Sequence, residues 1–167
     1  LEEGIKLPKP FLEVSTKFEK FDRNLDREEA LEISNLEPYE LDRILDLVLK
    51  IDALIQDEVS KRGLIHVDGK KEFALGKNRD PVLIDSFGTL DEDRWWDAES
   101  YSNGQIVQLS KEAVRQHYIE TGHHDSLHNA RKVGNDEPEI PALPQNIIDN
   151  TAKLYYSMFE RLTGLKF

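Results

Sequence analysis

Two absences in the sequence already exclude several kinds of protein. The 167 residues contain no cysteine, so disulfide frameworks and thiolate metal centres are excluded. No apolar run is longer than four residues, as at Val82–Ile84, whereas a helix that spans a bilayer needs about 20. We therefore expect a protein without structural disulfides, without zinc–thiolate sites and without a membrane partner.

Basic residues are also scarce relative to acidic ones. Lys and Arg number 22 against 33 Asp and Glu, which gives a formal net charge of −11. Such a surface repels a phosphate backbone and argues against a nucleic-acid partner, although a few clustered basic side chains can still bind a small anion. With 38% hydrophobic residues and this length, we expect residues 1–167 to form a single domain around a true core.

The pattern of apolar residues predicts an α+β fold, in which an antiparallel β-hairpin packs with several helices. The strongest helix runs from Pro38 to about Arg62, because apolar residues recur there at three- and four-residue steps. Two β-like runs follow, Leu64–Leu75 and Val82–Phe87, and the turn-forming residues between them favour a hairpin. The other expectations are a strand over 11–19, helices over 27–33, 110–120 and 145–163, an irregular stretch over 91–102 and a loop over 123–144.

The first strand of this hairpin carries three charged residues spaced two apart, Asp68, Lys70 and Glu72. The side-chain period of a strand places all three on one face. A face of this kind is also typical of the solvated side of an edge strand. The pattern alone therefore leaves a functional face and a solvated face open.

The register of the hairpin adds a second observation. If Leu75 pairs with Val82, Glu72 lies opposite Asp85, and directly opposed like charges are destabilising unless a cation lies between them. Mg²⁺ prefers carboxylate oxygens, and usually takes its remaining ligands from water and substrate phosphates. We therefore expect a magnesium–nucleotide site at Glu72 and Asp85, although a shift of one residue in register would remove the pairing.

Basic residues in two further places are candidates for binding an anion. Arg94 lies among carboxylates and two tryptophans, and its planar guanidinium suits a carboxylate or phosphate, with an internal ion pair as the alternative. Lys111 and Arg115 are four residues apart on a predicted helix and share one face, which is either an anion site or ordinary surface. The histidines between positions 117 and 128 fit no compact zinc pattern and are read as solvated.

Four segments carry a resemblance to one enzyme family. Gly63–Phe73 is similar to "gliivDtKfEFG", and the stretches Val82–Asp85 and Thr89–Trp96 are similar to "lvLiDEvlTPDssRfW". Leu7–Glu19 is similar to "lpePifTPsTKaE", and Pro141–Gly164 to "ppLPeeviekTrekYleayerLTG". These motifs, in this order and spacing, resemble those of the SAICAR synthetases (phosphoribosylaminoimidazole-succinocarboxamide synthases).

The resemblance implies an ATP-dependent ligase of purine biosynthesis, which joins L-aspartate to the carboxylate of carboxyaminoimidazole ribotide through an acyl phosphate. By their positions in the motifs, Glu72 and Asp85 would hold Mg²⁺ on the ATP phosphates. Lys17 and Lys70 would neutralise negative charge during phosphoryl transfer, with Lys17 also contacting ATP. The positions that would contact the ribotide or the incoming aspartate are Asp68, Asp91, Arg94, Lys111 and Arg115.

The family also has an N-terminal lobe, whose glycine-rich part covers the adenine of ATP. These 167 residues contain no glycine-rich phosphate loop, and the sequence from Leu1 onward reads as the middle of a protein. We therefore expect a fragment or processed chain that forms the C-terminal lobe and is not fully active alone. The resemblance further implies a cytoplasmic enzyme with the N-terminal lobe as its partner, and it allows a homo-oligomer.

Some positions depart from the family pattern. Gly69 stands in place of a threonine, Ala74 interrupts the usual Phe-Gly, Ser86 replaces a glutamate and Leu90 replaces a proline. The charged residues that are retained favour catalysis, and they are Asp68, Lys70, Glu72, Asp85, Asp91 and Arg94. The substitutions leave open a divergent relative that binds nucleotide or ribotide without catalysing the reaction.

Overall fold

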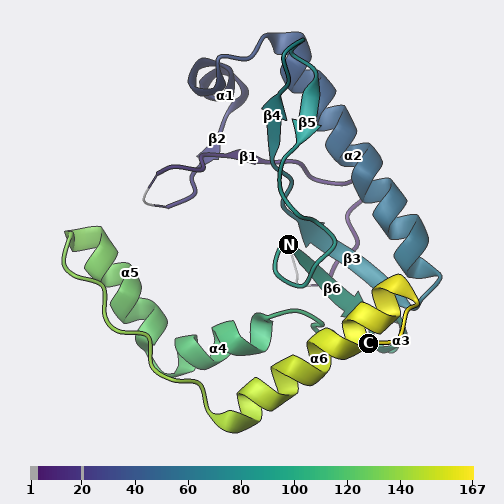
Figure 1. Cartoon of the computed structure of the whole chain (residues 1–167), viewed down its shortest axis with the longest axis vertical. Helices are drawn as coiled ribbons and strands as arrows, with labels where there is room; N and C mark the ends of the chain where they lie inside the picture. The colour runs from purple at the N-terminus through teal and green to yellow at the C-terminus, as the bar shows by residue number, and fades with distance from the viewer. Residues whose placement is uncertain (1–3, 20) are drawn as a thin grey trace. The chain divides into compact units, whose positions relative to one another are not determined.

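The computed structural model describes residues 4–19 and 21–167, and it has an α+β fold (Figure 1). Residue contacts divide the chain into two compact units. Unit 1 comprises the residues up to Gln56 together with Lys71–Ser86, and unit 2 comprises Asp57–Lys70 and Phe87–Phe167. The elements in chain order are β1 (Val14–Ser15), β2 (Asn24–Leu25), α1 (Arg27–Ser34), α2 (Pro38–Ser60), β3 (Leu64–Gly69), β4 (Phe73–Leu75), β5 (Pro81–Leu83), β6 (Asp93–Asp97), α3 (Ala98–Ser102), α4 (Glu112–Glu120), α5 (His123–Val133) and α6 (Gln145–Thr163).

The first part of unit 1 has little regular structure. The strand predicted over 11–19 is reduced to β1, which pairs antiparallel with β2. Helix α1 begins where the sequence predicts, because Asp26 caps it by accepting a hydrogen bond from the Glu29 N–H at 2.9 Å. Helix α2 is also confirmed, although it ends two residues before the predicted Arg62.

The tip of the β4–β5 hairpin is fixed to the beginning of α2, as Figure 1 shows. Glu40 in the first turn of α2 is 1% exposed and accepts a hydrogen bond from the Glu37 N–H at 2.8 Å. Arg79 at the hairpin tip donates to both carboxylate oxygens of Glu40, at 2.6 and 2.5 Å. This guanidinium lowers the pKa of Glu40 to about 2. A second ion pair joins Arg43 to Asp80 at 2.9 Å.

The hairpin itself is confirmed, but its register differs by one residue from the predicted one. The paired residues are Phe73 with Leu83, Ala74 with Val82, and Leu75 with Pro81. At the open end, the Ile84 N–H donates to the Glu72 carbonyl oxygen at 3.0 Å. Glu72 therefore lies opposite Ile84, and the predicted direct opposition of Glu72 and Asp85 is wrong. The cause is a tighter turn, closed by the Gly76 N–H donating to the Asp80 carbonyl at 2.9 Å, which brings proline into the first position of β5.

In unit 2, strand β3 pairs with a strand in a stretch that the sequence pattern leaves irregular. The antiparallel β3–β6 register joins Leu64 to Asp97, Ile65 to Trp96 and His66 to Trp95, then shifts to join Asp68 to Arg94 and Gly69 to Asp93. The predicted strand 64–75 is thus two strands, β3 and β4, in two different sheets. The strand β6 was hidden because a carboxylate, Asp93, occupies one of its buried positions.

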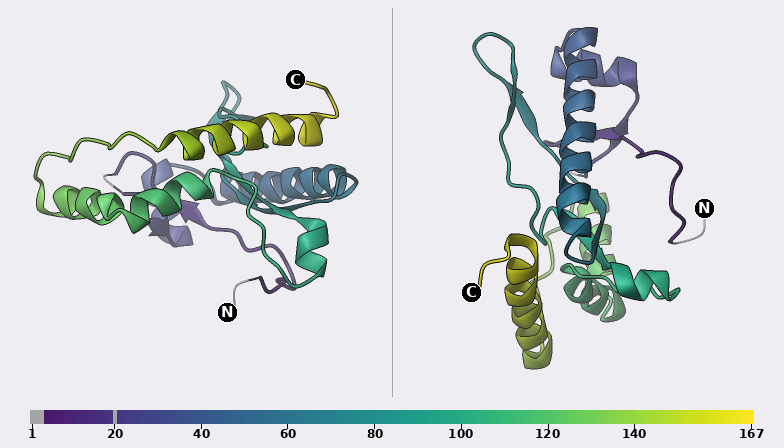
Figure 2. Two further views of the ribbon diagram at one scale, coloured as in Figure 1. Left: turned by 90° about the horizontal axis from the view of Figure 1, so that it is seen from below. Right: turned by 90° about the vertical axis from the view of Figure 1, so that its right-hand side faces the viewer.

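Two helices of unit 2 are absent from the sequence prediction, α5 and the short α3, which lies in the stretch 91–102 that was expected to be irregular. Helix α5 occupies the first part of the expected loop over 123–144, between two glycines, Gly122 and Gly134, in the left-handed conformation. Its polar composition gives no apolar stripe, so periodicity could not reveal it. Helix α6 is confirmed, and α4 contacts both α5 and α6. Figure 2 gives two further views of these helices. None of the helices in the described part of the chain is long and apolar enough to cross a membrane.

The core of unit 2 is closed by an arginine. Leu64, Trp95 and Met158 are its most buried apolar side chains. Arg161 of α6 donates to the carbonyl oxygens of residues 62 and 63, at 3.0 and 2.6 Å, and to the Asp97 carboxylate at 2.8 Å. Residue 63 is a glycine with a φ of +68°, and a Cβ there would lie 3.1 Å from the Arg161 guanidinium. Glycine is therefore required at this position both for the backbone conformation and for the contact.

Candidate active site

A pocket of about 190 Å³ in unit 2 gathers charged side chains from three separate stretches of the chain. The first stretch is the end of β3, the second runs from the turn before β6 into that strand, and the third is the start of α4. Its lining residues are Asp68, Leu90, Asp91, Glu92, Asp93, Arg94, Ser110, Lys111, Glu112 and Arg115. Every residue that the motifs assign to substrate binding is in this set. The fold therefore brings the predicted substrate-binding residues together.

The β3–β6 register places Arg94 beside Asp68 on the wall of this pocket. Arg94 Nε donates to Asp68 Oδ1 at 2.8 Å and Nη2 donates to Oδ2, so the ion pair is bidentate. Both side chains are about half exposed, and the Asp68 carboxylate raises the pKa of Arg94. The internal ion pair weighed from the sequence is thus present. It lies where an anionic ligand would reach the same guanidinium.

Asp91 has two partners in the pocket region, one of which the sequence reasoning missed. The Tyr155 hydroxyl of α6 donates to Asp91 Oδ1 at 2.8 Å, and Lys111 Nζ lies 3.7 Å from the same oxygen. Partial burial, together with the Asp91 carboxylate, raises the pKa of Tyr155 to about 12. Tyr155 was read only as part of the apolar face of this helix. The available signal was its hydroxyl, which needs a partner when the ring is half-buried.

The two basic residues predicted to share one helix face both line the pocket, although Lys111 lies just outside the helix. Lys111 lies directly before α4 and Arg115 one turn later, and both line the pocket. Arg115 Nη1 donates to Glu112 at 3.1 Å. Each of the three basic side chains of the pocket, Arg94, Lys111 and Arg115, therefore has a carboxylate within 4 Å.

A second missed feature is a buried pair of polar side chains next to the pocket. His66 Nε2 and Asp93 Oδ1 are 2.8 Å apart, and the two side chains are 2% and 0% exposed. The alternation of β3 places His66 on the same face as buried Leu64, so a buried histidine that needs a polar partner was predictable. The identity of that partner was not, because β6 had not been recognised.

The residues expected to bind nucleotide and metal belong to unit 1. The Lys17 ammonium contacts the Glu72 carboxylate, and the Glu72 side chain is only 11% exposed. Asp85 is exposed, and its Oδ1 accepts a hydrogen bond from the Ser86 N–H at 2.8 Å. Within residues 4–19 and 21–167, no three His, Cys, Asp or Glu side chains gather as a ready ligand set. Two carboxylates nevertheless fit Mg²⁺, which completes its shell with water and phosphate oxygens.

Lys70, the other residue expected to be catalytic, is placed in unit 2. It directly follows β3, and its N–H donates to the Glu92 carbonyl at 3.2 Å. Its side chain is exposed and is not part of the pocket lining. The structure therefore separates the predicted site residues into a paired group in the unit 2 pocket, a lysine beside that group, and a smaller group in unit 1.

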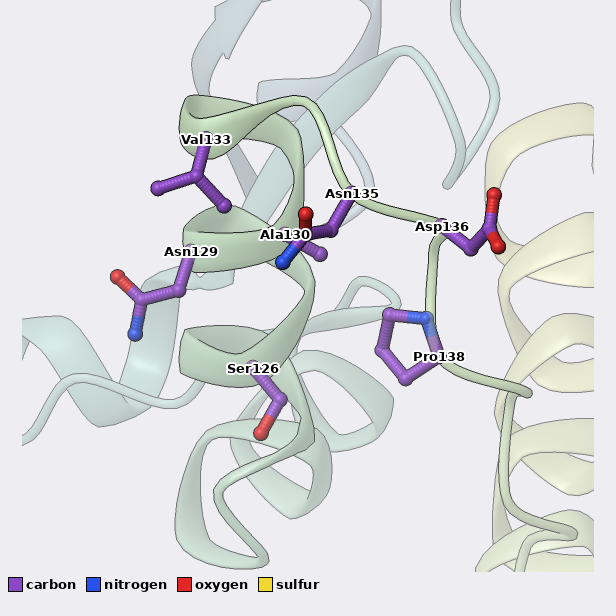
Figure 3. A pocket seen from close by; sticks show the side chains of 7 residues that line it. All are labelled: Ser126, Asn129, Ala130, Val133, Asn135, Asp136 and Pro138. Carbon is purple, nitrogen blue, oxygen red and sulfur yellow. The ribbon is translucent and has the colours of Figure 1, made fainter.

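A larger cavity of about 440 Å³ lies elsewhere in unit 2, and it contains none of the predicted site residues. As Figure 3 shows, it lies between α5 and the segment that follows it. Its lining residues are Ser126, Asn129, Ala130, Val133, Asn135, Asp136 and Pro138. Since one carboxylate is the only ionisable group among them, this cavity offers no counterpart for an anionic substrate.

Comparison with known proteins decides the family. Residues 1–130 match the family model described as SAICAR synthetase, which covers well over half of the chain. The chain belongs to the SAICAR synthetase family. The resemblance carried by the four sequence segments is therefore confirmed.

Individual members of the SAICAR synthetase family match nearly the whole chain. The phosphoribosylaminoimidazole-succinocarboxamide synthase of Thermoplasma acidophilum is 55% identical over 163 residues, which cover 98% of this chain and 55% of that protein. A solved SAICAR synthetase (Type-2) in complex with ADP has a TM-score of 0.71 at 26% identity, covering 100% of this chain and 56% of its own. The SAICAR-synthase from Saccharomyces cerevisiae complexed with SAICAR has a TM-score of 0.64 at 25% identity, covering 87% and 45%. The α+β fold is confirmed, and the chain spans about half the length of these relatives.

Proposed function

We propose that the protein catalyses the ATP-dependent joining of L-aspartate to the carboxylate of carboxyaminoimidazole ribotide. The observation that carries this proposal is the unit 2 pocket, which collects all the motif residues assigned to the ribotide and aspartate. The names of the related enzymes, and the ADP and SAICAR bound to two structural neighbours, support the same reaction.

The reaction comprises carboxylate activation and amide formation. A ribotide carboxylate oxygen attacks the γ-phosphorus of ATP, and the bond to the β,γ-bridging oxygen breaks to give an acyl phosphate and ADP. The aspartate amine then attacks the acyl carbon and loses a proton, and inorganic phosphate leaves. Since every reactant carries negative charge, the main task of the protein is to position these groups and neutralise their charge.

The basic side chains of the unit 2 pocket suit the anionic groups of the ribotide and aspartate. The guanidinium fork of Arg94 fits a carboxylate or a phosphate, and Lys111 and Arg115 provide two further cations on one wall. In the structure these cations are paired with carboxylates of the same pocket, namely Asp68, Asp91 and Glu112. Binding would therefore exchange internal carboxylates for ligand anions, with the cations already held in place.

The residues of unit 1 suit the nucleotide side of the reaction. Mg²⁺, when bound by Glu72 and Asp85, would neutralise the charge on the transferred phosphates. Asp85 is accessible for this role, and Lys17 holds the Glu72 carboxylate from one side. Lys17 and Lys70 would offset the negative charge of ATP and of the ribotide carboxylate during transfer.

We also propose that residues 1–167 are the C-terminal lobe of a cytoplasmic enzyme, with the ATP-covering lobe as partner. The 167-residue chain alone, mixed with ATP, Mg²⁺, aspartate and ribotide, should give no product, whereas the protein as encoded by its gene should turn over. Turnover by the chain alone would contradict the lobe assignment and leave the ligase assignment intact.

One observation favours a second candidate, a relative that binds ribotide without catalysis. Asp85 is not directly opposite Glu72, and the residue after it is Ser86 rather than the glutamate of the family pattern. Calorimetric titration separates the two candidates. Nucleotide binding that depends on Mg²⁺ supports the ligase, whereas ribotide binding that metal does not affect supports the non-catalytic relative.

The sharpest test of the ligase is the substitution Asp85→Asn in the protein as encoded by its gene. We expect kcat to fall about 100-fold, because a neutral amide is a poor ligand for Mg²⁺ on ATP. Asp80→Asn is the matched control, since Asp80 is a carboxylate of the same hairpin that pairs with Arg43. Equal activity of the Asp85→Asn and Asp80→Asn variants would show that Asp85 has no role in catalysis.

A further inference from the structure

The buried His66–Asp93 pair holds the turn that precedes β6 from the inside. Asp93 Oδ1 lies 2.8 Å from His66 Nε2, while its Oδ2 accepts a hydrogen bond from the Gly88 N–H. The Asp93 N–H donates to the Thr89 carbonyl at 3.0 Å. One fully buried carboxylate thus gathers residues 88–93 around itself. Loss of such a carboxylate would leave buried donors without partners, which is costly in a protein interior.

The turn held in this way supplies several of the lining residues of the unit 2 pocket. Asp91 and Glu92 lie within it and Arg94 directly follows it. The Thr89 hydroxyl oxygen accepts hydrogen bonds from the N–H groups of Asp91 and Glu92, at 3.3 and 3.4 Å. A displacement of the turn would therefore move Asp91 and Arg94 together.

His66 connects the same carboxylate to the other side of the pocket. It is paired with Trp95, and its ring centroid lies 4.9 Å from that of Trp95. The β3–β6 register shifts directly after His66, so that Asp68 pairs with Arg94. Such irregularities redirect a side chain near a site, and here the redirected side chain is Asp68. The His66–Asp93 contact thus locks β3 to β6 at the irregularity that sets the Asp68–Arg94 pair.

His66 and Asp93 act as one unit in a dry environment, because their side chains are 2% and 0% exposed and their polar atoms lie 2.8 Å apart. A substitution at either position removes a polar partner from the other inside the protein, where such a loss is costly.

We propose that His66 and Asp93 are positioning residues, which fix the turn 88–93 and the β3 irregularity and thereby set the geometry of Asp68, Asp91 and Arg94. Asp93 is among the lining residues, but its side chain is fully buried, so this role requires no contact between either side chain and the ligand. This proposal rests on the proposed function only in taking the ribotide as the ligand of the pocket. The positioning itself is a property of the ligand-free protein.

A double-mutant cycle in the protein as encoded by its gene tests the proposal. The variants are His66→Ile, Asp93→Ser and the double variant, which remove the two polar side chains one at a time and together. Each single substitution should raise KM for the ribotide about tenfold, with KM for ATP unchanged within about twofold. The double variant should lose little more than Asp93→Ser alone, because the two side chains act through one shared contact and both variants lack the acceptor of the Gly88 N–H. A double variant that loses as much as the two single variants multiplied would overturn the proposal.

A matched control separates positioning from general destabilisation. Glu40 is another buried carboxylate with a basic partner, and it lies in unit 1. Glu40→Gln should lower the unfolding temperature, as Asp93→Ser should, but should leave KM for the ribotide unchanged. If Glu40→Gln and Asp93→Ser raise that KM equally, the pair has only a structural role and the proposal is wrong.

Two measurements, one with the ligand and one without it, distinguish failure of this proposal from failure of the proposed function. If the parent protein does not bind the succinocarboxamide ribotide in calorimetry, the proposed function fails. Hydrogen exchange then decides the positioning. Asp93→Ser should speed exchange of the Gly88 and Asp91 amides at least about tenfold relative to the parent, and unchanged exchange there would overturn the proposal.

Discussion

The two units differ in how completely their predicted site residues are paired. In unit 2, Arg94, Lys111 and Arg115 already have carboxylate partners around one pocket. In unit 1, Lys17 contacts Glu72, while Asp85 is exposed and bonds to the N–H of its own neighbour. On the proposed function, the ribotide side is organised by the fold itself. In unit 1, Glu72 and Asp85 would act together only when the metal and the nucleotide bind.

The largest effect on activity is expected for substitution of Arg94, which tests whether the unit 2 pocket binds the ribotide. Arg94→Ala should lower kcat/KM for the ribotide about 100-fold or more, because it removes a bidentate donor whose place in the pocket is already set. Arg94→Lys is the matched control and should lose only about tenfold, since it keeps the charge and loses the fork. Steady-state kinetics against both substrates provides the measurement. A rise in KM for ATP as large as that for the ribotide would show that Arg94 affects nucleotide binding as much as ribotide binding.

An intermediate effect is expected at Tyr155, which sharpens the claim that unit 2 is organised in advance. Tyr155→Phe removes the hydroxyl that donates to Asp91 and leaves the ring in place. Ribotide affinity should fall about fivefold, which corresponds to one hydrogen bond. Tyr156→Phe on the same helix is the control, because Tyr156 is exposed and packs its ring against Phe167. Calorimetry that finds the two variants equal would remove Tyr155 from the site.

The smallest expected effect is on the stability of the folded protein at low pH. It compares one carboxylate from each unit, Glu40 and Asp97. The Arg79 guanidinium lowers the pKa of Glu40 from 4.5 to about 2, and the Ser100 N–H, with Arg161, lowers that of Asp97 from 3.8 to about 2. Since both values are lower in the folded state, both contribute stability above the unfolded pKa and lose it as the pH falls towards 2. The contribution of Glu40 should therefore begin to decline below about pH 4.5, and that of Asp97 below about pH 3.8.

Urea denaturation between pH 5 and pH 2.5 measures this decline. Glu40→Gln and Asp97→Asn should each flatten the pH dependence of the free energy of unfolding, since the substituted group no longer titrates. The contribution of Glu40 would be refuted if Glu40→Gln kept the slope of the parent protein in this range.

The unit 2 pocket was predictable as a set of residues, although not as a structure. Asp68 and Arg94 stand in motifs of the family, and Lys111 is noticeable in the sequence because it is four residues from Arg115. Their meeting depends on the β3–β6 pairing, and β6 was hidden by the buried Asp93 and by two adjacent tryptophans that break the alternation. The family resemblance predicts these residues as one group, and the structure places them around one pocket through a strand that the sequence pattern does not reveal.

In unit 1, the sequence predicts the structural element but not its exact pairing. The β4–β5 hairpin was correctly expected from turn-forming residues, yet its register was wrong by one position. The choice depends on whether proline belongs to the turn or to the strand, a difference of one hydrogen bond at Gly76. Because the period of a strand is two residues, that small difference moves Glu72 from opposite Asp85 to opposite Ile84. Periodicity could not decide it.

In this chain without cysteine, the Arg161 guanidinium cross-links distant parts of unit 2 by hydrogen bonds. It joins the turn after α2 to a helix 98 residues later, through donors that also reach Asp97. Unlike a disulfide, this closure is indifferent to reducing agents and forms only when both carbonyl groups and the carboxylate are in place. A protease cut in the connector between α5 and α6 should therefore leave α6 attached, until denaturant releases the last helix from the nicked chain.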